Sequence, residues 1–266
     1  MTMNYDAIVV GGGPSGATAA RRIAARGLKV LLLEKRGAGR EKPCAGGLTG
    51  RVLEEFGVPR SALDREIRGD FVCSPKCSVV TLTKLHTTGA CVMRGKFDRA
   101  LCSLAREEGA EIREDAEVLE PLIESGAVAG VRSREDGKIH EHRAKITVIA
   151  EGSSGAMCRR LGIYVGDARA IFLCVQQQME LPNAKISERI GDNIELYFGN
   201  TIAPVGYAWI FPKDNIVSVG LGAPLNVVRE HGIKLKDRLD EFILRHPVAS
   251  GKLKGVETNK SPPSRS

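Results

Sequence analysis

The chain has 266 residues, of which 42% are hydrophobic and 27% charged, the balance of a globular protein with a sizeable core. Its formal net charge of +7 favours an anionic partner. Lys and Arg are spread along the chain without an aromatic-studded basic block, so we expect no nucleic-acid partner.

A strand, a glycine-rich turn, a helix and a second strand open the chain. Residues 7–10 read as a buried parallel strand, 11–16 read G-G-G-P-S-G, 17–26 form helix and 30–33 form strand. In this pattern Gly11 permits the tight turn, Gly13 admits a pyrophosphate to the backbone, and Gly16 lets the helix pack on the strand. The amides at the helix start would hold the phosphates.

Glu34 ends the second strand, near the spacing of about 20 residues at which an acid accepts hydrogen bonds from a ribose diol. An acid here favours FAD or NAD over NADP, and the motif alone does not decide between FAD and NAD. The chain then enters a basic, glycine-rich loop at 35–50, with Pro-Cys-Ala-Gly-Gly-Leu at 43–48. At this point, after the acid, a nicotinamide enzyme usually continues to alternate strands and helices and does not enter such a loop.

Residues 69–73 and 78–83 read as strands joined by a turn. Cys73 and Cys77 flank that turn, but no second pair with ligand spacing follows, so we expect two thiols in a turn and no metal site. The cysteines number seven, an odd count, and no secretory leader precedes Tyr5. These features predict reduced thiols in a cytoplasmic protein.

Further strands are expected at 146–150, 170–180, 194–198, 207–211 and 216–221, and an amphipathic helix at 235–244. No stretch reads as a transmembrane helix, so any membrane contact is expected to be peripheral. Residues 249–266 are polar and basic, a composition that predicts disorder.

Residues 204–212 read P-x-x-Y-x-W-x-F-P and contain the only tryptophan. Tyr207, Trp209 and Phe211 have period-two spacing and would lie on one face of a strand. On spacing alone a sandwich core explains them. Beside a dinucleotide-binding unit, they become candidates for the wall of a slot that takes a long apolar ligand.

Taken together, the Cys-Ala-Gly-Gly-Leu and P-x-x-Y-x-W-x-F-P motifs make the sequence resemble the geranylgeranyl reductase family, over about residues 5–224. These are FAD enzymes of the para-hydroxybenzoate hydroxylase-like fold that saturate isoprenoid double bonds. The resemblance implies an α/β fold with an FAD-binding, Rossmann-like doubly wound layer and a second, mostly antiparallel substrate-side sheet. It implies an FAD-binding domain at 1–70 and 92–165, and a substrate-side domain at 71–91 and 166–248.

The resemblance also implies site residues. The adenosine half of FAD would be held by Gly11, Gly13, Ser15, Gly16 and Glu34.

The resemblance further implies that Cys44, Ala45 and Gly47 lie along the flavin. Arg94 would reach the cofactor phosphates, and Val118 would contact the adenine through its backbone.

A second flavin motif falls at Glu151 and Gly152, where the family's usual acid is aspartate. No Gly-Asp motif follows residue 230, which the family pattern requires, so we expect weaker flavin binding than in a full-length relative.

The implied reaction is hydride transfer from reduced FAD to a double bond of a prenyl lipid or prenyl diphosphate, with water excluded. Cys44 would donate the proton or pack against the flavin. Electrons would come from NADPH, a ferredoxin or another reduced carrier, and the protein would be cytoplasmic, with possible contact at the cytoplasmic membrane face. Two alternatives stay open: a flavin monooxygenase of the same fold, and a truncated, non-catalytic paralogue that binds flavin or lipid.

Overall fold

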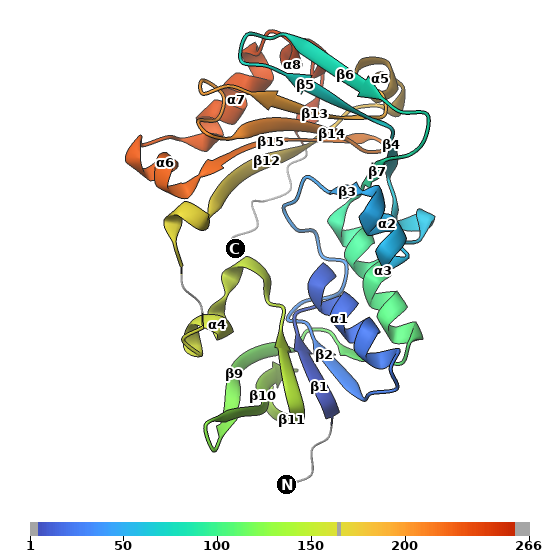
Figure 1. Cartoon of the computed structure of the whole chain (residues 1–266), viewed down its shortest axis with the longest axis vertical. Helices are drawn as coiled ribbons and strands as arrows, with labels where there is room; N and C mark the ends of the chain where they lie inside the picture. The colour runs from blue at the N-terminus through green and yellow to red at the C-terminus, as the bar shows by residue number, and fades with distance from the viewer. Residues whose placement is uncertain (1–4, 164–165, 259–266) are drawn as a thin grey trace. The chain divides into compact units, whose positions relative to one another are not determined.

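The computed structural model describes residues 5–163 and 166–258, and contacts divide these into two compact units (Figure 1). The first unit contains residues 5–42 and 94–163, and the second contains 43–93 and 166–258. The second unit therefore includes residues 43–70, which the sequence assigned to the first. The reason is the hydrogen bonding of this segment, because Arg65 Nε donates to Lys213 O over 3.1 Å and Lys213 Nζ donates to Ala45 O over 3.0 Å.

The first unit is a six-stranded sheet in the order β8-β2-β1-β11-β10-β9, flanked by helices. Its elements are β1 (Tyr5–Val10), α1 (Pro14–Ala24), β2 (Val30–Leu33), α3 (Arg94–Glu107), β8 (Glu111–Arg113), β9 (Glu117–Glu124), β10 (Ala127–Glu135), β11 (Lys138–Ile149) and α4 (Ala156–Arg160). Strands β8, β2, β1 and the second half of β11 are parallel, and β11, β10 and β9 are antiparallel.

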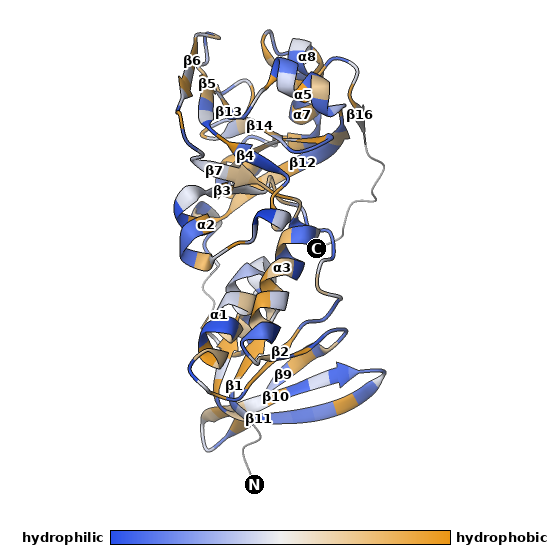
Figure 2. Ribbon diagram, turned by 90° about the vertical axis from the view of Figure 1, so that its right-hand side faces the viewer, coloured by the Kyte–Doolittle hydropathy of each residue, from blue (hydrophilic) through white to orange (hydrophobic). Residues whose placement is uncertain are grey.

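Strands β1 and β2 are apolar throughout because both of their faces are covered. Val9 and Leu32 pack with Ala20 of α1 and Ala105 of α3 on one face. On the other face, Ile8, Leu31 and their neighbours pack with Val131, Ala144 and Met157. Figure 2 shows the hydrophobic colour concentrated in β1 and β2, whereas β10 and β11 are mostly hydrophilic. The predicted α/β layer with parallel strands at its centre is confirmed.

The second unit is built on a seven-stranded sheet in the order β16-β12-β15-β14-β13-β5-β6, with a small sheet β3-β7-β4 beside it. Its strands are β3 (Gly47–Thr49), β4 (Arg65–Ile67), β5 (Gly69–Cys73), β6 (Val79–Thr83), β7 (Gly89–Cys91), β12 (Phe172–Glu180), β13 (Asn193–Phe198), β14 (Tyr207–Pro212), β15 (Ile216–Pro224) and β16 (Glu257–Thr258). Its helices are α2 (Gly50–Phe56), α5 (Asn183–Arg189), α6 (Leu225–Glu230), α7 (Leu235–Arg245) and α8 (Ala249–Lys252).

The large sheet has two different faces. Alternate residues of its strands, among them Tyr197, Ile210 and Leu221, form a core with Leu239 and Phe242 of α7 and Ala249 of α8. Figure 1 shows α7 and α8 on this side of the sheet. We call this the helix-covered face. The other residues of the same strands, which include the three aromatics of β14, form the opposite face, which we call the aromatic face.

The prediction of disorder from residue 249 is wrong for residues 249–258. Ala249 and Leu253 are buried in the core, and β16 pairs with β12. Lys252 forms an ion pair with Glu195 of β13, whose carboxylate also accepts a 2.6 Å hydrogen bond from Tyr197. Tertiary contacts thus order a segment whose composition would not order it alone. Residues 259–266 lie outside the described part of the chain.

Replacing Lys252 by Met will lower the free energy of unfolding by about 3 kcal/mol at neutral pH, because it leaves the fully buried Glu195 carboxylate without its cation. Burial already raises the pKa of Glu195 above 4.5. A carboxyl with a raised folded-state pKa contributes stability at low pH and loses it as the pH rises through that pKa. The deficit should therefore shrink as the pH falls from neutral towards pH 4.5, because protonation removes the buried charge that Lys252 compensates.

Urea denaturation of the wild type and Lys252→Met at both pH values measures this, and Glu195→Gln combined with Lys252→Met is the matched control. The double variant should recover most of the loss at neutral pH. An equal deficit in the single and double variants would contradict the buried-charge explanation.

Candidate functional site

The glycine-rich turn after β1 brings three chain segments into close contact. Gly11 has a positive φ of +103°, and a Cβ there would lie 2.5 Å from Ala150 O at the end of β11. A Cβ on Gly16 would collide with Gly11 O. At Gly13, the N-cap of α1, a Cβ would meet no atom within 4 Å. Gly11 and Gly16 are therefore required for packing, while Gly13 borders open space at the helix N-terminus.

Glu34, just after β2, ties this turn to the sheet. Its carboxylate is buried and accepts a 2.6 Å hydrogen bond from Gly12 N through Oε2. Oε1 accepts from Arg36 N over 3.1 Å and lies 3.1 Å from Arg40 Nη1. Since two carboxylate oxygens offer about four acceptor positions, the group retains capacity for a ligand hydroxyl.

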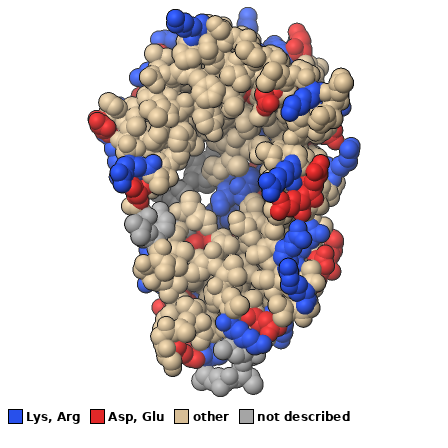
Figure 3. All heavy atoms as spheres, in the orientation of Figure 1, with Lys and Arg blue, Asp and Glu red and all other residues tan. Residues whose placement is uncertain are grey.

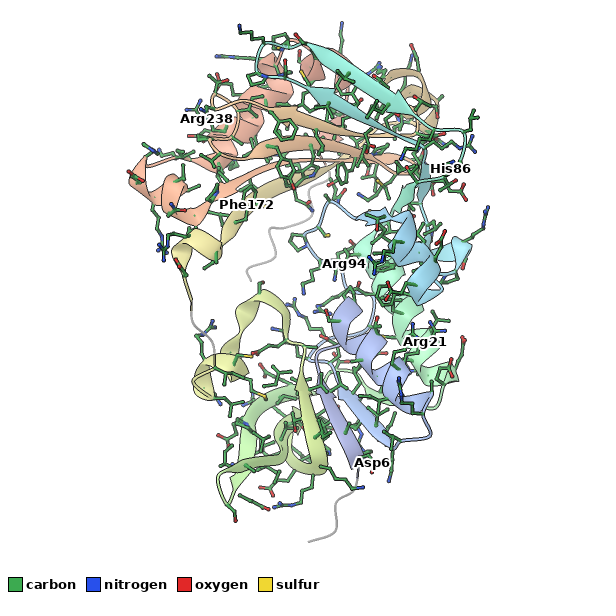
Figure 4. All side chains as sticks on the ribbon, viewed as in Figure 1. Asp6, Arg21, His86, Arg94, Phe172 and Arg238 are labelled. Atoms are coloured by element: carbon green, nitrogen blue, oxygen red, sulfur yellow. The ribbon has the colours of Figure 1, made fainter. Side chains whose placement is uncertain are left out.

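Basic side chains of the same unit gather beside the turn. Lys42 is half-buried, and burial, followed by the charges of Arg94 and Arg40, lowers the pKa of its ammonium group. Its Nζ lies 3.5 Å from the position of a Cβ on Gly152. Arg94, labelled in Figure 4 at the start of α3, makes two 2.8 Å hydrogen bonds to the buried carboxylate of Asp98. The mutual repulsion of these cations favours an anion among them.

The remaining predicted residues of this unit have different positions. Glu151 accepts hydrogen bonds of 2.9 and 3.1 Å from Met157 N and one of 3.1 Å from Cys158 N, so its carboxylate caps α4. Ser15 is exposed in the first turn of α1. Val118 lies on β9 against the core. Sequence reasoning missed Arg40 and Lys42, although both lie in the basic loop that follows Glu34.

In the second unit, the loop of Cys44, Ala45 and Gly46 is fixed through three successive carbonyl groups. Gln176 Nε2 of β12 donates to Cys44 O over 3.2 Å. Lys213 Nζ donates to Ala45 O over 3.0 Å, and the lysine is only 1% exposed. Val92 N donates to Gly46 O over 2.9 Å. The donors come from three different parts of the chain, so the loop has a defined conformation.

Gly46 and Gly47 allow this loop to lie against its neighbours. Gly46 has a φ of +82°, and a Cβ there would collide with Val92 O. A Cβ on Gly47 would lie 2.6 Å from Cε2 of Phe211. The loop that carries Cys44 therefore packs directly on the strand that carries the three predicted aromatic residues. The sequence predicted both segments but not their contact.

Tyr207, Trp209 and Phe211 lie on one face of β14, as predicted, because Ala208 and Ile210 enter the core on the other. Trp209 lies over Gly220 of β15, whose missing side chain leaves room for the indole. The Trp209 and Tyr207 rings are 6.1 Å apart. These rings begin a continuous aromatic surface.

Two further rings extend this surface. Tyr207 lies 6.0 Å from Phe172 of β12 and 6.0 Å from Phe198 of β13. Phe172, labelled in Figure 4, lies over Gly222, where a Cβ would come within 2.5 Å of the ring. Sequence reasoning missed Phe172 and Phe198, which the period-two pattern of their own strands would have placed on this face.

Charged side chains of both signs lie on the surface, with a net excess of positive charge. On the face drawn in Figure 3, basic and acidic side chains lie next to one another along the right-hand edge. Among residues 5–163 and 166–258, no helix combines the length and apolarity needed to cross a membrane.

Comparisons with known proteins agree with this geometry. An FAD-binding domain model matches residues 4–209, and a geranylgeranyl reductase catalytic domain model matches 171–261. A digeranylgeranylglycerophospholipid reductase of Thermoplasma acidophilum is 34% identical over 251 residues, which are 91% of this chain and 62% of that protein. One from Methanoculleus marisnigri is 34% identical over 253 residues, 92% of this chain and 62% of its own length.

The fold is also similar to those of solved flavoprotein structures. A geranylgeranyl bacteriochlorophyll reductase-like protein from Thermoplasma acidophilum superposes with a TM-score of 0.86 at 33% identity, covering 96% of this chain and 64% of that one. A flavin-dependent brominase, with a TM-score of 0.80 at 20% identity and coverage of 97% and 67%, shares the fold. The chain thus spans less than two thirds of the two reductases and of the reductase-like protein. The two family models together match residues 4–261, and the reductase of Thermoplasma acidophilum is 34% identical over 91% of the chain, so the chain belongs to the FAD-dependent geranylgeranyl reductase family.

Proposed function

We propose that this chain takes part in the flavin-dependent saturation of double bonds in a geranylgeranyl lipid or related prenyl compound. The observation that carries the proposal is the packing of the Cys44 loop on the aromatic face of the second unit. The relatives named digeranylgeranylglycerophospholipid reductase support the substrate class.

The first unit offers groups that fit FAD. Open space at Gly13 admits a pyrophosphate to the amides at the start of α1, and Arg40, Lys42 and Arg94 supply positive charge. Glu34 keeps acceptor capacity for the ribose hydroxyls. Ser15, Val118 and Gly152 remain proposed contacts. Because Glu151 already accepts hydrogen bonds from α4, its proposed contribution is to position Gly152 rather than to bind phosphate.

The second unit offers an apolar surface for a prenyl chain. Tyr207, Trp209 and Phe211, with Phe172, present rings but no charged side chain, which suits an unfunctionalised hydrocarbon. Such a surface excludes water from the reacting bond. The indole N–H of Trp209 is buried and has no hydrogen-bond partner among the described residues.

Reduced FAD supplies the hydride when bound. An isolated alkene cannot stabilise the resulting carbanion, so a proton must reach the other carbon at nearly the same time. Cys44 is the proposed proton donor, and the hydrogen bonds to Cys44 O, Ala45 O and Gly46 O hold its backbone in place. We propose NADPH, a ferredoxin or another reduced carrier as the electron source, and peripheral contact with a lipid surface, which the net charge of +7 would favour.

The test of this function is anaerobic incubation of the FAD-loaded, dithionite-reduced protein with a geranylgeranyl lipid in detergent, followed by mass spectrometry. We expect products heavier by two hydrogens for each saturated bond, and Cys44→Ser should lower the rate at least about tenfold. A flavin-loaded protein that leaves the lipid unchanged would contradict the proposal. A protein that cannot be loaded with FAD would indicate the non-catalytic paralogue.

Gly13→Ala and Gly16→Ala form a matched pair that separates binding from packing. Gly13→Ala should leave the stability of the FAD-free protein within about 1 kcal/mol, because its Cβ meets no atom, yet weaken FAD binding at least about tenfold. Gly16→Ala should destabilise the FAD-free protein by about 3 kcal/mol through collision with Gly11 O. Thermal unfolding and flavin fluorescence titration measure both. Unchanged FAD affinity in Gly13→Ala would rule out this turn as the pyrophosphate site.

Lys213→Met should loosen the loop that carries Cys44, because Ala45 O loses its buried donor at a cost of about 1–3 kcal/mol. Hydrogen exchange of the peptide that spans 44–47 should become faster. Lys236→Met, an exposed lysine of α7, is the control and should leave the exchange unchanged. Equal exchange in both variants would show that Lys213 does not hold the loop.

A further inference from the structure

Two cysteines and a histidine gather at the edge of the core, on the helix-covered face of the large sheet. Cys73 is the last residue of β5, Cys77 lies in the turn before β6, and His246 follows α7. The two Sγ atoms and one histidine ring nitrogen all lie within 4.8 Å of one another. Cys73 is fully buried and Cys77 half-buried. This side of the sheet is the reverse of the aromatic face, so the cluster is separate from the proposed substrate surface.

The turn between β5 and β6 holds the second thiol beside the first. Ser74 N donates to Ser78 O and Cys77 N donates to Ser74 O, both over 2.9 Å, and Ser78 N donates to Ser74 Oγ over 3.0 Å. Cys77 has a φ of +59°, in the left-handed region that residues with a side chain rarely adopt. With this backbone its side chain packs against the core that contains Cys73. The tight turn therefore maintains a Cys-x-x-x-Cys pair with facing sulfur atoms.

The hydrogen bonds of His246 argue against a metal ion at this cluster. Its Nδ1 accepts hydrogen bonds from Val248 N over 3.3 Å and from Ala249 N over 3.1 Å. Burial lowers the pKa of His246, which keeps the ring neutral, so the proton resides on Nε2. Neither ring nitrogen then has a lone pair free for a metal. A metal-binding histidine instead donates from its second nitrogen to an acceptor.

We propose that Cys73 and Cys77 form a reversible intramolecular disulfide. The oxidant is a low-molecular-weight disulfide, R–S–S–R. The Cys77 thiolate attacks it, forming a Cys77–S–S–R bond and releasing one RS⁻, and the Cys73 sulfur then attacks the Cys77 sulfur and releases the second RS⁻. The two thiols lose two electrons, the oxidant gains them, and the two thiol protons end on two molecules of RSH.

The surroundings assign the order of attack. Cys77 is partly exposed, whereas Cys73 is buried, and desolvation by burial raises the pKa of the Cys73 thiol to about 11. Cys77 therefore reacts first, and Cys73 resolves the mixed disulfide. Forming the disulfide requires only a small movement, because the two sulfur atoms already lie within 4.8 Å of one another. Rotation of χ1 in either cysteine changes the distance between them.

The sequence supplies a direct test, because trypsin cleaves after Lys76, between the two cysteines. The protein is incubated with oxidised glutathione, its free thiols are alkylated, and it is digested without reductant. Peptides 69–76 and 77–84 each contain one cysteine. We expect them as a linked pair, two hydrogens lighter than their sum, which dithiothreitol separates.

One variant and two other buried cysteines of the chain serve as controls. Cys77→Ser should eliminate the linked pair and leave Cys73 alkylated after unfolding. Cys91 and Cys102 are buried, and burial raises the pKa of their thiols to about 12 and about 11, so both should stay unlinked in the same digest. Two separate, fully alkylated peptides at high oxidised glutathione would overturn the proposal. So would a stoichiometric metal ion, detected by elemental analysis of the purified protein, that protects both thiols.

Discussion

The alternation of side chains along β13, β14, β15 and β12 is the constraint on which the second unit depends. Successive residues of a strand point to opposite faces, so the segment that sends Ala208 and Ile210 into the core also presents Tyr207, Trp209 and Phe211 on the other side. One face is occupied by helices. The other is occupied by rings and by the loop of Cys44. A shift of one residue in the pairing of β14 would exchange the two faces and remove the site and the core together.

The first unit was predicted more completely than the second because its motif is local. The glycines, α1 and Glu34 follow one another within a short segment, and their spacing alone specifies the turn. The contacts that fix the Cys44 loop are not local: Gln176 is 132 residues from Cys44, and Lys213 is 168 residues from Ala45. A lysine directly after an aromatic strand gives no sign that its ammonium group will be buried.

The difference between local motifs and distant contacts also explains why the prediction of disorder was wrong for residues 249–258. Residues 249–258 have the composition of a disordered segment, and disorder was the reasonable expectation from that alone. Lys252 is ordered by Glu195, 57 residues earlier, and by its position 3.7 Å from the centre of the Phe71 ring. The cluster of Cys73, Cys77 and His246 combines local and distant contacts. The sequence predicted the turn that holds the two cysteines, but His246 lies beside them only through the packing of α7.

The position of Trp209 makes the protein its own optical probe. It is the only tryptophan in the chain, it lies over Gly220, and its N–H has no acceptor among the described residues. Indole emission responds to both polarity and hydrogen bonding, so light absorbed by this single ring reports on one known spot of the aromatic face. Because the ring is only 5% exposed, its emission reports on the packing around that spot, without any added label.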